Sequence, residues 1–168
     1  MTHRPPARAP IAHNAAMALR FLLPASIALA SAACAGPPQA AAGDGATFIV
    51  VRHAEKADDT ARDPDLGPAG RERALELARL LAGEDLVAVH ATGFRRTRQT
   101  VQPTADAHGI EPLEYDAAGP AGEFAARLRS EHRRGTILVA GHSNTVPGIV
   151  AALCSCDTEE MPETEYDR

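Results

Sequence analysis

The stretch Ala46-Thr-Phe-Ile-Val-Val-Arg-His-Ala-Glu-Lys56 joins an apolar run directly to charged and titratable side chains. Residues 47–51 are all β-branched or aromatic, which is typical of a strand buried on both faces of a sheet. The run stops at Arg52 and His53. Ligands of open α/β sheets bind beyond the carboxyl ends of the strands, and a guanidinium beside an imidazole suits a phosphate. The stretch therefore predicts a strand that ends in an anion site.

The rest of the chain alternates between helical and strand patterns. In chain order we expect a helix at 68–83, a strand at 86–90, a helix from about 94, a strand at 110–115, a helix at 120–132, a strand at 136–140, and a helix capped by Ser143 or Asn144 that ends near 153 with Pro147 in its first turn. This order predicts an α/β domain, a three-layer α/β/α sandwich around a mostly parallel central sheet.

Side chains that can bind phosphate follow several of these strands. Arg96 comes shortly after the second predicted strand, and His142 directly follows the fourth. Parallel strands present their carboxyl ends at the same edge of a sheet. We therefore expect Arg96 and His142 to converge with Arg52 and His53.

Three arginines crowd the start of the helix near residue 94. Arg95, Arg96 and Arg98 repel one another there and oppose the helix dipole. A bound anion would relieve this arrangement. For Arg95 and Arg98 we favour a simpler interpretation, which is pairing with the many carboxylates of an acidic protein.

Residues 1–33 have the composition of an export signal. They contain three arginines and no acid, followed by an apolar stretch with small residues at its end. Ser-Ala-Ala-Cys34 resembles a lipoprotein cleavage site, so a lipid anchor at Cys34 and a soluble exported protein both stay open. Residues 34–45, rich in proline, alanine and glycine, are expected to form a flexible tether to a domain at 46–168. We expect a periplasmic or membrane-anchored location.

The charge balance argues against nucleic acid as a partner. Without residues 1–33 the chain has 14 basic and 22 acidic residues, a net charge of −8, whereas nucleic-acid binding needs a basic face. Cys154 and Cys156 have the option of a disulfide, which would close a small strained ring, and with no third cysteine nearby they make no zinc site.

The motifs together resemble the histidine phosphatase superfamily, the phosphoglycerate-mutase-like enzymes, in its short phosphatase branch. The resemblance spans nearly all of residues 46–168. Four ordered motifs carry it: Arg-His-Ala-Glu at 52–55, with Ala54 in place of the usual glycine; Leu66, Gly70 and Ala74 at the following helix; Arg-Thr-Arg-Gln-Thr at 96–100; and Gly-His-Ser at 141–143.

This resemblance implies a phosphatase that hydrolyses phosphomonoesters or related phosphoryl groups through a covalent phosphohistidine. His53 would be the nucleophile, while Arg52, Arg96 and His142 would hold the phosphoryl oxygens as cationic donors. No metal or other cofactor is expected. The substrate would be a small phosphorylated molecule or a phosphoprotein, and the short loops suggest an open pocket of broad specificity.

The proton donor and the C-terminal region depart from the family pattern. Asp116, at the end of the third predicted strand, is our candidate general acid, with Glu55 second. Without an acid, substrates with good leaving groups such as phosphohistidine or acyl phosphates are favoured. Family members usually continue into a further strand where this chain has residues 157–168, which leaves open that the domain lacks a final strand.

Several rival functions fit less well. A serine hydrolase would need a histidine downstream of Ser143, and His142 is the last histidine of the chain. The histidines also lack the short spacings of zinc hydrolases. Mutase activity would need extra loops. The alternative from another class is a non-catalytic domain that binds a phosphorylated ligand without turnover.

Overall fold

The computed structural model describes residues 45–58 and 61–166. The predicted export signal, the candidate anchor Cys34 and almost all of the predicted tether lie outside the described residues. Within the described ranges, none of the helices combines the length and the apolar character needed to span a bilayer.

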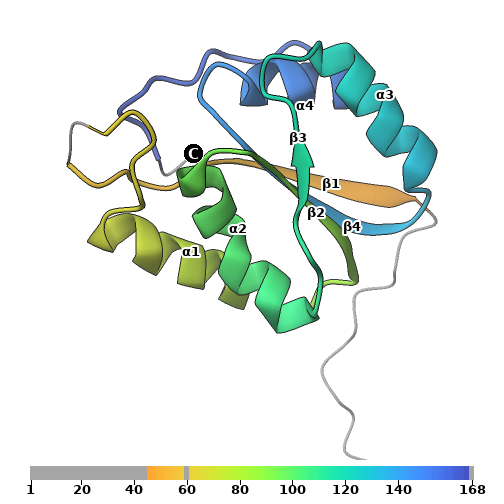
Figure 1. The fold of residues 1–168 in the computed structure, drawn as a ribbon. Helices are drawn as coiled ribbons and strands as arrows, with labels where there is room; N and C mark the ends of the chain where they lie inside the picture. The colour runs from red at the N-terminus through yellow and green to blue at the C-terminus, as the bar shows by residue number, and fades with distance from the viewer. Residues whose placement is uncertain (1–44, 59–60, 167–168) are drawn as a thin grey trace, which may run out of the picture. The chain divides into compact units, whose positions relative to one another are not determined.

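Over the described residues, four strands and four helices alternate (Figure 1): β1 (Ala46–Arg52), α1 (Pro68–Leu80), β2 (Leu86–Thr92), α2 (Arg95–His108), β3 (Leu113–Tyr115), α3 (Ala121–Glu131), β4 (Gly135–Gly141) and α4 (Val146–Cys154). The strands pair in the order β1-β4-β2-β3, and every pair is parallel. Helices α1 and α2 cover one face of the sheet, and α3 and α4 cover the other. The predicted α/β/α sandwich is confirmed.

Two element ends and one cap differ from the prediction. Helix α1 ends at Leu80, before Gly83, and strand β3 has three residues. Neither Ser143 nor Asn144 caps helix α4, because both precede its N-cap residue Thr145, and the helix receives no side-chain cap. The Ser143 hydroxyl donates to the Glu163 carboxylate. Pro147 does lie in the first turn of α4, as expected.

Apolar side chains fill both sides of the sheet. Val89, Leu138 and Val101 are buried with α1 and α2, whereas Ile137, Val139 and Leu128 are buried with α3 and α4. These aliphatic side chains are fully enclosed, so their burial stabilises each layer by roughly 1.5–3 kcal/mol per side chain. The sheet is thereby a rigid base for the side chains at its carboxyl edge.

The pairing of β1 with β4 places two histidines next to each other. Arg52 lies opposite Gly141 in this parallel register, and the main-chain N–H of His53 donates to the Gly141 carbonyl at 2.9 Å. His53 and His142 are therefore neighbours beyond the strand ends. Gly141 has no room for a side chain, because a Cβ there would lie 2.8 Å from Thr145 Oγ1 and 2.9 Å from the Tyr115 hydroxyl.

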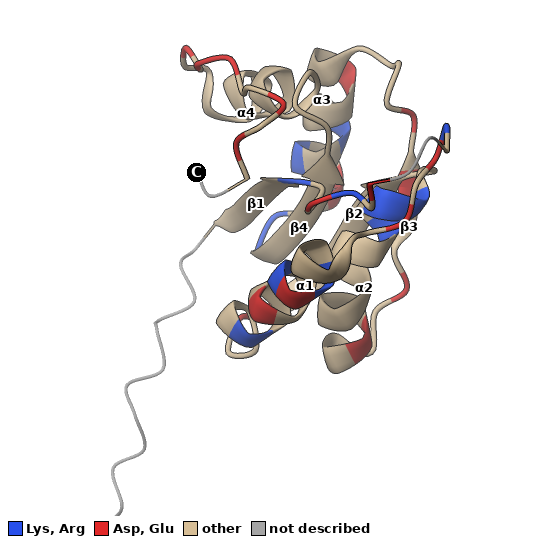
Figure 2. Cartoon of the chain, turned by 90° about the vertical axis from the view of Figure 1, so that its left-hand side faces the viewer, with Lys and Arg blue, Asp and Glu red and all other residues tan. Residues whose placement is uncertain are grey.

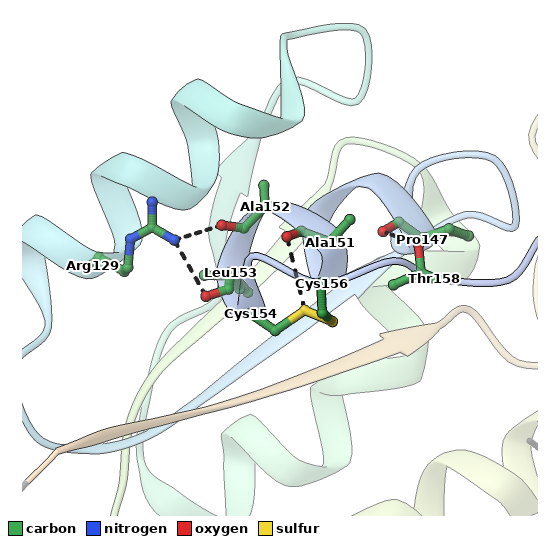
Figure 3. Close-up of a disulfide and its surroundings, with 8 residues drawn as sticks. All are labelled: Arg129, Pro147, Ala151, Ala152, Leu153, Cys154, Cys156 and Thr158. Carbon is green, nitrogen blue, oxygen red and sulfur yellow. Dashed lines mark hydrogen bonds between the residues drawn. A yellow bond between two sulfur atoms is a disulfide. The ribbon is translucent and has the colours of Figure 1, made fainter.

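A disulfide closes the end of α4. Cys154 and Cys156, which the sequence left open, are bonded through a turn in which Ser155 has a φ of 55°. Arg129 of α3 donates to the Ala152 carbonyl at 2.6 Å and thus ties α3 to the same end (Figure 3). The chain after this turn returns toward the carboxyl end of β1 without forming a helix or strand over residues 157–166. Whether the domain lacks a final strand stays a prediction.

Candidate active site

The carboxyl edge of the sheet gathers the four residues predicted to bind a phosphoryl group. The ring centroids of His53 and His142 are 5.4 Å apart. Arg96 Nη2 lies 3.5 Å from Nδ1 of His142. Arg52 and Arg96 both depress the pKa of His53 by their charge, as expected for close cationic neighbours. Their convergence follows from the parallel sheet, while their chemical roles stay predictions.

His53 is oriented as a neutral imidazole. Its side chain is buried, and Nδ1 lies 2.8 Å from the Ala54 carbonyl oxygen. A carbonyl only accepts, so Nδ1 carries the hydrogen and the lone pair is on Nε2. Burial, followed by the charges of Arg96, His142 and Arg52, lowers the His53 pKa to about 4. At pH 7 the ring is therefore neutral and able to act as a nucleophile.

Helix α2 and the start of α1 fix the loop that carries His53. The Thr100 hydroxyl donates to the Arg96 carbonyl at 2.7 Å and accepts from the Ala54 N–H at 2.9 Å. Gln99 accepts from the main chain of Leu66 at 2.8 Å. On the other side, a Cβ at Gly70 would clash with the main chain of Glu55. The motif at 96–100 thus positions the nucleophile's loop as well as supplying Arg96.

His142 is held by two buried threonines. Nε2 lies 3.0 Å from Thr92 Oγ1, which in turn lies 2.8 Å from Thr97 Oγ1. The Thr97 hydroxyl donates to the Phe94 carbonyl at 2.8 Å. Thr92 then donates to Thr97 and accepts from Nε2–H of His142. This chain of hydrogen bonds leaves a lone pair on Nδ1, which faces Arg96.

The charge of His142 differs from the sequence expectation. Burial and the charge of Arg96 lower its pKa to about 4, so without a ligand it is neutral at pH 7. The sequence resemblance predicts a third cationic donor here. The physical reason for the difference is that two arginines near a buried imidazole make its protonated form costly.

The arginines at the start of α2 divide as predicted. Arg95 pairs with Asp65 at 2.7 Å and Arg98 with Glu114 at 3.6 Å, and both arginines are exposed. Arg96 is largely buried, 3.3 Å from Asp63 and 4.4 Å above the Phe94 ring. Basic and acidic segments therefore lie together at this end of the sheet (Figure 2).

The two candidate proton donors have other partners. Asp116 is exposed and accepts from the Ala118 N–H at 2.9 Å, so it stabilises its own turn. It lines a separate cavity of about 220 Å³ with Asn144 and Thr145. Glu55 accepts from Arg73 at 2.6–3.0 Å, and these hydrogen bonds lower its pKa. Asp116 as the general acid stays a prediction.

The sequence patterns did not single out five contributors to the site, which are Thr92, Thr97, Thr100, Ser143 and Glu163. Thr92 follows an apolar strand, a signal that could have marked it. Ser143 and Thr100 lie within recognised motifs but act through their hydroxyls. Glu163, which lies 3.4 Å from Arg52, comes from a distant segment with no periodic pattern, so no local signal marks it. Among the described residues, no group of three or more His, Cys, Asp or Glu is arranged to hold a metal ion.

Comparisons with known proteins agree with this geometry. Residues 48–118 match the model of the histidine phosphatase superfamily (branch 1). A search of curated proteins found no significant match. Among solved structures, the protein histidine phosphatase SixA, complexed with tungstate, is 23% identical with a TM-score of 0.55, over 68% of this chain and 80% of that one.

Two further structures share the fold. A phosphoserine phosphatase from Entamoeba histolytica, in complex with 3-phosphoglyceric acid, is 14% identical with a TM-score of 0.52, covering 67% of this chain and 81% of that one. A mycobacterial glucosyl-3-phosphoglycerate phosphatase is 13% identical with a TM-score of 0.53, covering 64% and 78%. The family match over residues 48–118 and the fold shared with these phosphatases agree with the ordered motifs and with the histidines and arginines gathered at the sheet edge.

Proposed function

We propose that this protein is a phosphatase that hydrolyses phosphoryl groups through a covalent phosphohistidine at His53. The observation that carries the proposal is the orientation of this ring: Nδ1–H is bound to the Ala54 carbonyl, which leaves the Nε2 lone pair available beside Arg52, Arg96 and His142. The names of the similar structures, which are phosphatases, support the same reaction class.

The first step transfers the phosphoryl group to the enzyme. His53 Nε2 attacks phosphorus, the P–N bond forms, and the bond between phosphorus and the leaving group breaks with its electron pair on the leaving atom. Arg52 and Arg96 offset the negative charge of the equatorial oxygens, which is the main contribution a protein makes to such a transfer. In the second step water attacks phosphorus, the P–N bond breaks with its electron pair returning to Nε2 of His53, the water loses a proton to solvent, and inorganic phosphate leaves.

His142 takes part as a proton acceptor. Its Nδ1 lone pair would repel phosphoryl oxygens, whereas a bound anion favours the imidazolium. We therefore propose that Nδ1 takes up a proton when the phosphoryl group binds, either from the substrate monoanion or from water. Thr92 keeps accepting from Nε2–H in both states.

The substrate is proposed to be a small phosphorylated molecule or a phosphoprotein with a good leaving group. Asp116 hydrogen-bonds its own turn and Glu55 is paired with Arg73, which favours substrates whose leaving group needs no proton from either carboxyl group. Phosphohistidine, acyl phosphates and aryl phosphates need this proton least. A cavity of about 350 Å³ lies beside His53 and Arg52, on the side of α1, and neither Arg96 nor His142 lines it.

Metal independence and export are part of the proposal. Two guanidinium groups supply the charge that a metal ion supplies in other phosphatases, so activity should survive treatment with EDTA. The composition of residues 1–33 supports export, and the disulfide is compatible with an oxidising compartment. Cell fractionation tests the location, and replacement of Cys34 by serine distinguishes a lipid anchor from a soluble protein.

The test of function is hydrolysis of p-nitrophenyl phosphate. We expect His53→Ala to reduce kcat by roughly 10³-fold or more. His108→Ala is the matched control, since His108 lies at the far end of α2 and contacts the Leu81 carbonyl; it should retain activity. A well-folded wild type that binds phosphate but hydrolyses no phosphorylated compound would instead support the non-catalytic alternative.

A further inference from the structure

The segment of residues 157–166, which we call the strap, runs from the end of α4 to the anion-binding groups. Its base is held by the Cys154–Cys156 disulfide and by the Thr158 hydroxyl, which donates to the Pro147 carbonyl at 3.0 Å (Figure 3). Its far part lies against the carboxyl end of β1 (Figure 1). The strap therefore joins the outer end of one helix to the centre of the site.

The strap takes all four terminal N–H groups of Arg52. Nη1 donates to the carbonyls of Pro162 and Glu165, each at 2.9 Å. Nη2 donates to the Glu163 carbonyl at 2.7 Å and lies 3.4 Å from the Glu163 carboxylate. The Tyr166 ring covers the guanidinium at 4.1 Å. As folded here, Arg52 has no terminal N–H left for a bidentate phosphate.

The Glu163 carboxylate lies where an anion is expected. Ser143 Oγ donates to its Oε1, and Lys56 Nζ lies 3.8 Å from its Oε2. The hydrogen bond from Ser143, followed by the charges of Arg52 and Lys56, lowers the pKa of Glu163. A carboxylate from the chain itself thus occupies donors next to the histidine pair.

An anion can replace these contacts, because they offset the positive charge of Arg52 only in part. The Arg52 side chain is 4% exposed, so its charge needs an anionic partner. Three of its contacts are to neutral carbonyls, and the one carboxylate is 68% exposed and therefore weakly held. A phosphoryl group offers up to two negative charges and three acceptor oxygens. It is the better partner for the same N–H groups.

We propose that the strap is a built-in competitor of the phosphoryl group: Glu163 and the neighbouring carbonyls occupy Arg52 and Ser143 in the resting protein, and an anion binds by displacing them. This inference rests on the proposed function, in which Arg52 holds phosphoryl oxygens. Displacement also opens the cavity beside His53, because Met161 and Tyr166 of the strap form part of its wall.

Binding of inorganic phosphate, measured by isothermal titration calorimetry, tests the competition without turnover. Glu163→Gln keeps the shape of the side chain and removes its charge. We expect it to tighten phosphate binding by roughly 3- to 10-fold, because a larger fraction of the protein is then competent to bind. Glu160→Gln is the matched control, since it removes the same charge from an exposed position of the same segment. It should change affinity by less than about 2-fold.

Hydrogen exchange supplies a second measurement that does not depend on a variant. Saturating phosphate should speed amide exchange in residues 157–166 and leave α1 unchanged. Equal affinities for wild type and Glu163→Gln, or slower exchange in the strap when phosphate binds, would overturn the proposal, the latter by showing a lid that closes over the anion.

The two proposals fail in different ways. Tighter phosphate binding in Glu163→Gln without any hydrolysis would reject the phosphatase function and support the strap as a competitor. Hydrolysis that depends on His53, together with an unchanged phosphate affinity in Glu163→Gln, would support the phosphatase function and reject the strap as a competitor.

Discussion

The end of β1 and the start of α2 each bring one arginine to the candidate site, but the two arginines are held differently. Arg52, at the end of β1, is bound by main-chain carbonyls and a carboxylate of the strap, which comes from more than a hundred residues away. Arg96 is fixed from within its own neighbourhood by Asp63 at 3.3 Å and the Phe94 ring. The first arginine is occupied by an exchangeable partner, whereas the second is preorganised.

The site therefore contains one arginine that must first release its partners in order to bind an anion, and one arginine that is already in position. Preorganised donors contribute most to stabilising charge in a transition state, so Arg96 should carry more of the catalytic effect. Arg52 contributes after the strap has left, and its net effect is reduced by the contacts that it gives up. Three predictions follow from this contrast.

The largest effect is expected at Arg96. Arg96→Ala should lower kcat/KM for p-nitrophenyl phosphate by roughly 10³-fold, and Arg52→Ala by roughly 10²-fold, because loss of Arg52 also removes the strap's anchor. In a Glu163→Gln background, the Arg52→Ala loss should grow toward the Arg96→Ala loss. Arg98→Ala, at an exposed pair with Glu114, serves as the control. Equal losses of kcat/KM for Arg52→Ala in both backgrounds would contradict the view that the strap occupies Arg52 and not Arg96.

A smaller effect is expected at Thr92. Thr92→Val removes the acceptor for Nε2–H of His142 and should reduce kcat/KM by about 10-fold. The hydrogen bond from the protonated ring is charge-assisted and is therefore the stronger of the two that Thr92 accepts. Its loss lowers the pKa of His142 further, so the high-pH limb of the rate profile should move to lower pH. Thr92→Ser keeps the hydroxyl and should restore the profile. A uniform loss of rate without a shift of this limb would indicate a merely structural role.

The smallest effect concerns stability in acid. Burial lowers the pKa of His53, His142 and the core residue His90 from 6.5 to about 4. Between pH 6.5 and 4 the unfolded chain therefore binds more protons than the native protein, so stability is lost as the pH falls through this window. We expect Tm to drop by roughly 10 °C between pH 6.5 and 5.

Added phosphate and the variant His53→Ala show how much of the loss of Tm in acid comes from the site histidines and how much from His90 in the core. Anion binding should restore part of the Tm lost through His53 and His142, which adjoin the arginines. It should not offset the part due to His90, whose ring lies against Phe124 and His132. His53→Ala should flatten the decline of Tm with pH. A decline as steep as that of wild type would contradict the pKa assigned to His53.

The fold and the histidine pair could be predicted because their signals are local. Apolar runs such as 47–51 and 136–140 mark buried parallel strands, and such strands deliver the residues that follow them to a single edge. His53 and His142 are therefore neighbours for a reason visible in the sequence. The pairing of Arg95 and Arg98 with carboxylates followed in the same way from the acidic composition.

The rest of the site depends on contacts that no local pattern encodes. The strap binds Arg52 mainly through main-chain carbonyls. Every residue type has such a carbonyl, so the sequence of the strap gives no sign of this contact. The neutral state of His142 depends on its burial and on the approach of Arg96. The position of Asp116 after a predicted strand favours a general acid, yet the same position suits a turn residue whose carboxylate accepts from the Ala118 N–H.

Trapping of the phosphorylated enzyme tests the central claim most directly. The protein is mixed with ³²P-labelled acetyl phosphate, quenched in base, where phosphohistidine survives, and mapped by peptide mass spectrometry. A covalent intermediate predicts label on Nε2 of His53 in the wild type and none in His53→Ala. Turnover of the same substrate with label on His142, or with no labelled histidine at the shortest quench times, would contradict it.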